Sequence, residues 1–192
     1  MPREPVPALW TSARVSHGYV ADYKPFSFVD GEGVRCSLYV SGCLFQCEGC
    51  YNRAAWSFRL GEKYSVSIED QVMRDLAHDS VQGLSLLGGE PFVNTEVCLS
   101  VARRLRREFG HTKDVWCWSG YTFEQLIADD SDKRALLELV DVLIDGPYLE
   151  AERDLTLPFR GSANQRVVDV PASLAAKEAV PWHARRVSHV QA

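Results

Sequence analysis

The sequence predicts an α/β fold: a partial, open β/α barrel of about five to six parallel strands. Segments with strand character alternate with segments of helical periodicity between about residues 26 and 170. The expected strands are nearly continuous apolar runs, which is typical of parallel strands that are buried on both faces. A closed eight-stranded barrel takes about 250 residues. This chain has 192 residues, so we expect the barrel to stay open.

One domain is expected over residues 26–170. An irregular N-terminal arm is expected over residues 1–25, because this stretch holds four of the nine prolines and shows no sustained periodicity. A weakly structured tail is expected over residues 171–192. The content of hydrophobic residues, 46%, is sufficient for a core that needs no disulfide bridges.

The first strand of the domain is expected over residues 34–41. Its sequence, "VRCSLYVSG", alternates and is rich in β-branched and aromatic residues. The first helix is expected in "IEDQVMRDLAHD", with Ser67 and Asp70 as a capping-box-like start and Val72 and Leu76 at helical spacing.

The second strand is expected in "GLSLLGGEP", a short buried run that ends in glycines. Asn94 or Thr95 is expected to cap the second helix. An apolar stripe along this helix is formed by Val97, Val101, Leu105 and Phe109. A solvated basic face is expected for Arg103, Arg104, Arg106 and Arg107.

The remaining elements continue the alternation. "DVWCWSG" is expected to be the third strand and "YTFEQLIADD" the third helix, with Thr122 and Gln125 as its capping box. "VDVLIDGPY" and "QRVVDV" are expected to supply the last two strands. In parallel α/β folds the reactive groups lie at the carboxyl ends of the strands. That rim would therefore carry the stretches "SGCLFQC", "GGEP", "WSGY" and "DGPY".

The charge pattern excludes some classes of function. The net charge of -5, from 21 basic and 26 acidic residues, argues against a nucleic-acid polymer or an anionic membrane as the main partner. No apolar run approaches the roughly 18 residues of a membrane span. The start "MPREPVPALW" has no secretory or transit pattern. We expect a cytoplasmic protein.

The stretch "SGCLFQCEGCYN" places Cys43, Cys47 and Cys50 within eight residues. Disulfide frameworks belong to small secreted chains that lack a sufficient core, and this chain does not fit that class. Cysteines at such short spacings in a reducing compartment more often bind a metal or carry out redox chemistry.

Zinc and an iron–sulfur cluster are the two metal hypotheses. Structural zinc needs four closed ligands, but the histidines are scattered singly along the sequence. Cys36, Cys98 and Cys117 have the apolar surroundings of core thiols. A four-iron cluster usually takes four thiolates. With three from the protein, one iron remains open to a ligand that is not a protein side chain.

The pattern Cys-x3-Cys-x2-Cys on a loop after the first strand resembles that of the radical S-adenosylmethionine (SAM) enzymes. The resemblance implies that Cys43, Cys47 and Cys50 hold one 4Fe-4S cluster whose open iron binds SAM. In that family the reduced cluster cleaves SAM to methionine and a 5'-deoxyadenosyl radical, which abstracts a hydrogen atom from a substrate. Cluster and cosubstrate carry this chemistry, so we expect no catalytic side chain.

Further SAM contacts follow from the same resemblance. Gly88, Gly89 and Glu90 in "LLGGEP" resemble the family's site for the methionine amino group, although without the cysteine loop they would predict a plain β-turn. Gly49 stands where the family usually has an aromatic residue before the third cysteine. We therefore expect adenine contacts through the backbone from Gly49 through Cys50 to Tyr51.

Several long stretches together are similar to the small activating enzymes of anaerobic ribonucleotide reductases, among them "DGEGVRCSLYVSGCLFQCEGCYNRAAW", "WSGYTFEQL" and "LPFRGSANQRVVDV". This similarity implies a glycyl-radical reductase subunit as protein substrate and a low-potential electron donor. For five further polar residues the sequence leaves open whether they take part in the cofactor site or only form the hydrogen bonds of a turn or a helix cap. They are Asp145, Arg160, Ser162, Asn164 and Gln165. Core positions are expected for Trp56, Trp116 and Trp118.

Two alternatives remain at this stage. The first is an activase of another glycyl-radical enzyme, or a small radical SAM enzyme that acts on a peptide or a metabolite. The second is an iron–sulfur electron-transfer protein or a zinc-binding module, and it requires a fourth protein ligand beside the three thiols. Only folding that brings Cys36 or Cys117 near the loop would supply that ligand as a thiol.

Overall fold

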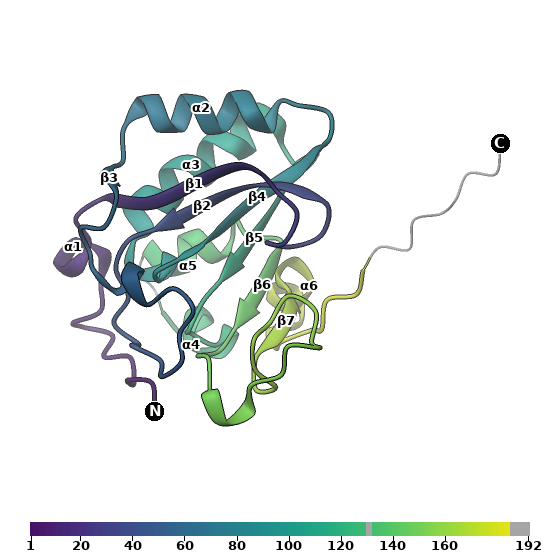
Figure 1. Ribbon diagram of the computed structural model, residues 1–192. Helices are drawn as coiled ribbons and strands as arrows, with labels where there is room; N and C mark the ends of the chain where they lie inside the picture. Colours follow the sequence, from purple (N-terminus) through teal and green to yellow (C-terminus); the bar gives the residue numbers. More distant parts are fainter. Residues whose placement is uncertain (130–131, 185–192) are drawn as a thin grey trace.

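The computed structural model describes residues 1–129 and 132–184. In these residues the strands form one mixed sheet in the order β3-β1-β2-β4-β5-β6-β7 (Figure 1). The strands are β1 (Tyr19–Ser27), β2 (Val34–Val40), β3 (Glu62–Lys63), β4 (Val81–Gly88), β5 (Asp114–Trp118), β6 (Val142–Asp145) and β7 (Arg166–Asp169). The α-helices are α1 (Ser12–Val15), α2 (Val66–Leu76), α3 (Thr95–Phe109), α4 (Phe123–Ile127), α5 (Asp132–Leu137) and α6 (Val170–Ala176). Short 3-10 helices are η1 (Arg53–Trp56), η2 (Pro91–Val93) and η3 (Glu150–Glu152).

The centre of the sheet confirms the predicted α/β class. Strands β2, β4, β5 and β6 pair in parallel, and helices connect them. The sheet is open, with β3 at one edge and β7 at the other. The parallel run is shorter than the predicted five to six strands, because β1 and β7 pair antiparallel. The chain reaches β7 from β6 through a long loop with no crossover α-helix, so β7 returns beside β6 in the opposite direction.

The helix starts follow local capping chemistry. The predicted capping box of α4 is confirmed, because the Thr122 side chain accepts from the Gln125 backbone and the Gln125 side chain accepts from the Thr122 backbone. The predicted start of α2 at Ser67 is wrong by two residues. Ser65 has the extended backbone of an N-cap and accepts a hydrogen bond from the Ile68 backbone, so Ser67 already lies in the first turn.

Two hydrophobic cores lie on opposite faces of the sheet. Alternate residues of β5 separate them: Val115 and Cys117 belong to the main core with the buried faces of α2 and α3, whereas Trp116 belongs to a smaller cluster with Ile144. Phe159 and Trp182 pack edge-on against Trp116, with ring centroids at 4.9 and 5.0 Å. The second face is therefore covered in part by the loop before β7 and by the chain that follows α6.

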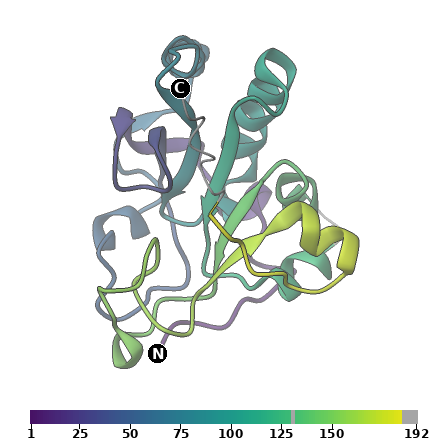
Figure 2. The ribbon, with the colours of Figure 1, turned by 90° about the vertical axis from the view of Figure 1, so that its right-hand side faces the viewer.

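The ends of the chain are more ordered than the sequence predicts. The expected irregular arm over residues 1–25 contains α1 and most of β1, whose alternation is interrupted near Pro25 by an irregular register beside β2. The expected tail over 171–192 begins inside α6, and its residues 185–192 lie outside the described residues. Figure 2 shows α6 on the opposite side of the molecule from the N-terminal strands. None of the helices in the described ranges is long and apolar enough to cross a membrane.

Candidate cofactor site

A cavity of about 180 Å³ lies at the carboxyl ends of the parallel strands. Four rim segments supply its walls: the cysteine loop after β2, the glycine-rich end of β4, the turn after β5 and the loop after β6. The lining residues are Cys43, Phe45, Cys47, Cys50, Asn52, Trp56, Leu87, Gly88, Gly89, Glu90, Trp118, Ser119, Gly120, Gly146, Tyr148 and Gln165. The structure thus gathers on one rim the stretches that the sequence predicts there.

Three thiols line this cavity, those of Cys43, Cys47 and Cys50. Burial, reinforced by the negative charge of Glu90, raises the pKa of Cys43 well above its ordinary range. Burial also raises the pKa of Cys47, to about 11. Both thiols are therefore protonated at neutral pH, and metal binding must release their protons.

Backbone N–H groups already face two of these sulfurs. The backbone amides of Phe45 and Gln46 lower the pKa of Cys43, and the backbone amide of Tyr148 lowers that of Cys47. These amides favour the thiolate and partly oppose the effect of burial. The site therefore has preformed partners for sulfur ligands that carry negative charge.

The two glycines at the end of β4 allow a close approach to the cysteine loop. A Cβ atom on Gly89 would lie 2.5 Å from the carbonyl oxygen of Gly42, the residue before Cys43. Gly88 has a φ of +101°, a backbone conformation that L side chains rarely adopt. Hydrogen bonds join the two segments, from the Gly89 amide to Val40 and from the Glu90 amide to Gly42.

Glu90 is 1% exposed, and both its carboxylate oxygens accept hydrogen bonds. Oε1 accepts from the Phe92 amide at 3.0 Å and from Ser119 Oγ at 2.8 Å, and Oε2 accepts from the Gly120 amide at 2.8 Å. Burial raises the pKa of this carboxyl to about 7, against the opposing effect of those bonds. Glu90 thus links the end of β4 to the turn after β5.

Gly49 and Tyr51 do not line the cavity. Gly49 packs against the loop after β6, where an added Cβ would lie 1.9 Å from Glu150 Oε2. The side chain of Tyr51 is fully exposed. Adenine contact through the backbone of this segment therefore stays a prediction.

The five polar residues whose roles the sequence leaves open mostly form hydrogen bonds or ion pairs with nearby side chains and backbone groups. Asp145 is buried and accepts from the Phe123 amide at 2.8 Å, so it caps the first turn of α4, and it also pairs with Arg166. Arg160, Asn164 and Gln165 donate to backbone carbonyls of the same turn or of the loop after β6. The Ser162 hydroxyl accepts from the Leu149 amide at 3.2 Å. Gln165 is the member of this group that also lines the cavity.

Two tryptophans that were expected in the core line the cavity as well. Trp56 lies in η1, and its indole Nε1 is buried with no hydrogen-bond partner among the described residues. Trp118 donates from Nε1 to the Phe159 carbonyl at 2.8 Å, while one side of it faces the cavity. The signal for Trp118 is its place at the end of the third strand, as the first residue of the rim stretch "WSGY". Trp56 offers no comparable signal, because it lies beyond the cysteine loop.

The donor set fits an iron–sulfur cluster with one iron that lacks a protein thiolate. Cys36, Cys98 and Cys117 are fully buried in the core and are absent from the lining of the cavity. In the described part of the chain, no three His, Cys, Asp or Glu side chains form a site for a single metal ion. A four-iron cluster places each thiolate on a different iron, so it needs more widely spaced sulfurs than one ion does.

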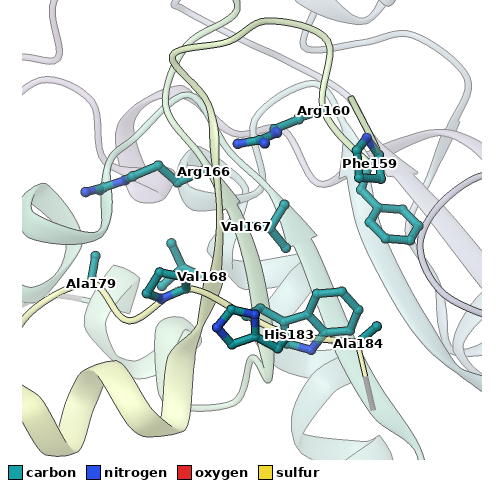
Figure 3. Close-up of a pocket in the computed structure, with 11 residues that line it drawn as sticks. Phe159, Arg160, Arg166, Val167, Val168, Ala179, His183 and Ala184 are labelled. Carbon is teal, nitrogen blue, oxygen red and sulfur yellow. The ribbon is translucent and has the colours of Figure 1, made fainter. Parts of the chain in front are cut away.

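A larger cavity of about 520 Å³ lies elsewhere, between β7, the loop at Phe159 and the segment at Trp182. Figure 3 shows Arg160 and Arg166 on one side of this cavity and His183 on the other. Its lining residues include no cysteine. Size alone therefore does not identify the cofactor site.

An open α/β sheet with three thiols around one rim cavity defines the class of small iron–sulfur domains. The family model for a 4Fe-4S single cluster domain matches residues 29–168, which include the whole parallel sheet and the cysteine loop. The chain is 42% identical to the anaerobic ribonucleoside-triphosphate reductase-activating protein of Vibrio cholerae, over 74% of this chain and 92% of that protein. It is 43% identical to the Haemophilus influenzae protein of the same name over the same shares, and 38% identical to that of Escherichia coli K12 over 76% of this chain and 94% of that protein. The chain belongs to the family of anaerobic ribonucleoside-triphosphate reductase-activating proteins.

Proposed function

We propose that this protein is a radical SAM activating enzyme that generates a glycyl radical on an anaerobic ribonucleoside-triphosphate reductase. Cys43, Cys47 and Cys50 hold one 4Fe-4S cluster, and SAM binds at the iron that these thiolates leave open. The observation that carries the proposal is the convergence of three thiols and the Gly88–Gly89 turn on one cavity, in a chain that belongs to this family.

The cluster, when bound and reduced, supplies the electron that splits SAM into methionine and a 5'-deoxyadenosyl radical. The protein contributes binding, orientation and exclusion of water. Backbone amides of Phe45, Gln46 and Tyr148 stabilise the thiolates of Cys43 and Cys47. Glu90 holds the end of β4 against the turn after β5, so that the glycine backbone is presented to the methionine part of SAM.

The hydrogen atom comes from the α-carbon of one glycine in the reductase. A glycine radical is delocalised over two flanking peptide groups, and no side chain blocks the approach to it. The cavity is small and lies at a rim, so a loop of the reductase must enter to complete the site. The proposal also includes a low-potential electron donor for the cluster. It places the protein in the cytoplasm, where thiols stay reduced. The activity needs neither a nucleic-acid polymer nor a membrane.

The test is product analysis on anaerobically purified protein that has been reconstituted with iron and sulfide, reduced, and mixed with SAM. We expect 5'-deoxyadenosine and methionine from the unaltered protein and none above background from the Cys47→Ala variant. Cys98→Ala is the matched control, because Cys98 is a fully buried thiol on α3 that does not line the cavity. This control should retain SAM cleavage. Cleavage in Cys47→Ala, or loss of the cluster in Cys98→Ala, would contradict the ligand assignment.

A further inference from the structure

The first 18 residues precede the part of the chain that the family model matches, and two of them, Arg3 and Trp10, contact the cysteine loop. We call residues 1–18 the N-terminal arm. The amide of Arg3 donates to the carbonyl oxygen of Phe45 at 2.8 Å. Trp10, which is 7% exposed, contacts the ring of Phe45 edge-on, with ring centroids 5.0 Å apart. The arm therefore holds Phe45 both by its backbone and by its ring.

The other side of Phe45 is held by the turn after β5. The rings of Phe45 and Tyr121 meet edge-on at 5.1 Å, and Gly120 lies so close that an added Cβ would be 2.6 Å from the Phe45 ring. Phe45 is 2% exposed although it lies in a loop. Edge-on aromatic pairs each contribute about 0.5–1.5 kcal/mol beyond the burial of area. Trp10 thus closes an aromatic stack that fixes the middle of the cysteine loop.

The peptide unit between Phe45 and Gln46 connects the arm to a cluster ligand. Its carbonyl oxygen accepts from the Arg3 amide, and it lies in the loop that runs from Cys43 to Cys47. Gln46 has a φ of +50°, a conformation that side chains other than glycine seldom adopt. Such a conformation persists only where neighbouring contacts hold it. The arm supplies two of those contacts.

We propose that Trp10 and the Arg3 amide position Cys43 for the cluster, by holding the Phe45–Gln46 peptide of the cysteine loop in place. This inference rests on the proposed function, since it assumes that Cys43 is a cluster ligand. Hydrogen bonds to cluster sulfurs and exclusion of solvent both set the reduction potential of a cluster. Trp10 is therefore a positioning residue, with no contact to the reacting atoms.

A pair of variants at Arg3 isolates the backbone contact. Arg3→Pro removes the N–H donor, whereas Arg3→Ala keeps it and removes only an exposed side chain. In the reconstituted full-length protein we expect Arg3→Pro to release iron to a chelator about tenfold faster than the unaltered protein. Its reduction potential, followed by EPR during a redox titration, should shift to a more negative value. Arg3→Ala should match the unaltered protein in both measurements.

A second set of variants tests the ring contact. Trp10→Ala should show the same two changes, and Trp10→Phe should restore most of the iron retention because it keeps an aromatic edge against Phe45. Leu9→Ala is the matched control, since Leu9 is an exposed apolar residue of the same arm. Val101→Ala, in the core on α3, controls for general destabilisation, and it should leave the potential unchanged.

The outcomes separate this inference from the proposed function. Unchanged iron release and potential in both Arg3→Pro and Trp10→Ala, while Cys47→Ala fails to hold the cluster, would overturn the role of the arm and leave the proposed function intact. If Cys47→Ala holds the cluster as well as the unaltered protein does, both proposals are overturned. A Trp10→Ala variant that does not fold leaves the Arg3 pair to decide.

Discussion

Glu90 lies buried behind the glycine turn, with three donors on its two carboxylate oxygens. The family resemblance predicts that it offers negative charge to the SAM ammonium group. Its observed partners give it a second task, which is to connect two rim segments. Because burial dominates, its pKa rises from an ordinary 4.5 to about 7. The carboxyl therefore changes its charge within the neutral range.

The raised pKa of Glu90 predicts a pH dependence of stability in the cluster-free protein. Between about pH 4.5 and 7 the folded state keeps the proton on Glu90 and the unfolded state releases it, so the free energy of unfolding falls as pH rises through this window. Glu90→Gln cannot titrate and should lack this fall. It should also be less stable by about 1–3 kcal/mol at low pH, because an amide NH2 group cannot accept a hydrogen bond, whereas the O–H oxygen of the protonated carboxyl still can. Urea unfolding at pH 5 and pH 7.5 measures both effects, and equal pH slopes for the two proteins would contradict the account.

Tyr51 is a second residue whose position differs from the one expected, because the segment from Gly49 to Tyr51 is expected to contact adenine. Its side chain is fully exposed beside Cys50, where packing does not need it. An exposed aromatic residue next to a site that a partner must enter is typical of a protein interface. We expect Tyr51→Ala to change the free energy of unfolding by less than about 0.5 kcal/mol.

The same variant should cleave SAM normally in the absence of the reductase. Glycyl-radical formation on the reductase should be about tenfold slower at limiting concentration, because a contact with the partner is lost. The rate of radical formation by EPR, compared with the yield of 5'-deoxyadenosine, separates the two steps. Loss of SAM cleavage in Tyr51→Ala would instead place this side chain in the SAM site.

Among the elements, α4 depends on a contact that is distant in sequence. Its capping box uses Thr122 and Gln125, but the Phe123 amide in its first turn donates to Asp145, at the end of β6. Asp145 also pairs with Arg166 on β7. One buried carboxylate therefore joins a helix start and two strands at the rim.

Removing that carboxylate should destabilise the rim. We expect Asp145→Ala to lower the free energy of unfolding by about 2–3 kcal/mol, since it leaves a helix-start amide and an arginine without this partner. Glu124→Ala, which removes the exposed partner of Arg166, should cost less than about 1 kcal/mol. Urea unfolding of both variants measures the difference. Equal decreases in the free energy of unfolding for the two variants would mean that the buried carboxylate stabilises the protein no more than the exposed one does.

The elements also show which features local sequence can predict. The strand at Val34–Val40, the helix at Thr95–Phe109 and the capping box of α4 depend on periodicity and on contacts within a few residues, so the sequence predicts them well. The direction of β7 and the strand β1 depend on pairing with distant segments. Helix α5 was not expected, because its short apolar pattern merges with the preceding helix.

At the scale of the whole molecule, the parallel sheet places four separate loops on one rim. That placement follows from the topology, so the sequence predicts which stretches meet there. It does not predict that Trp56 joins the lining, or that the N-terminal arm packs on Phe45, because those contacts come from tertiary packing. The cysteine motif is contiguous in the sequence, so its chemistry can be predicted. The side chains that pack around it come from distant segments, so they cannot.

The proposed activity of this chain is the generation of a radical on a glycine of an anaerobic ribonucleoside-triphosphate reductase. The first measurement to make is EPR spectroscopy of that reductase after anaerobic mixing with the reduced protein and SAM. We expect an organic radical whose signal is a doublet, because one α-hydrogen remains on the glycine, and no such signal when Cys47→Ala replaces the unaltered protein. Cleavage of SAM with no radical on the reductase, or the same radical with Cys47→Ala, would mean that the chain does not have this activity.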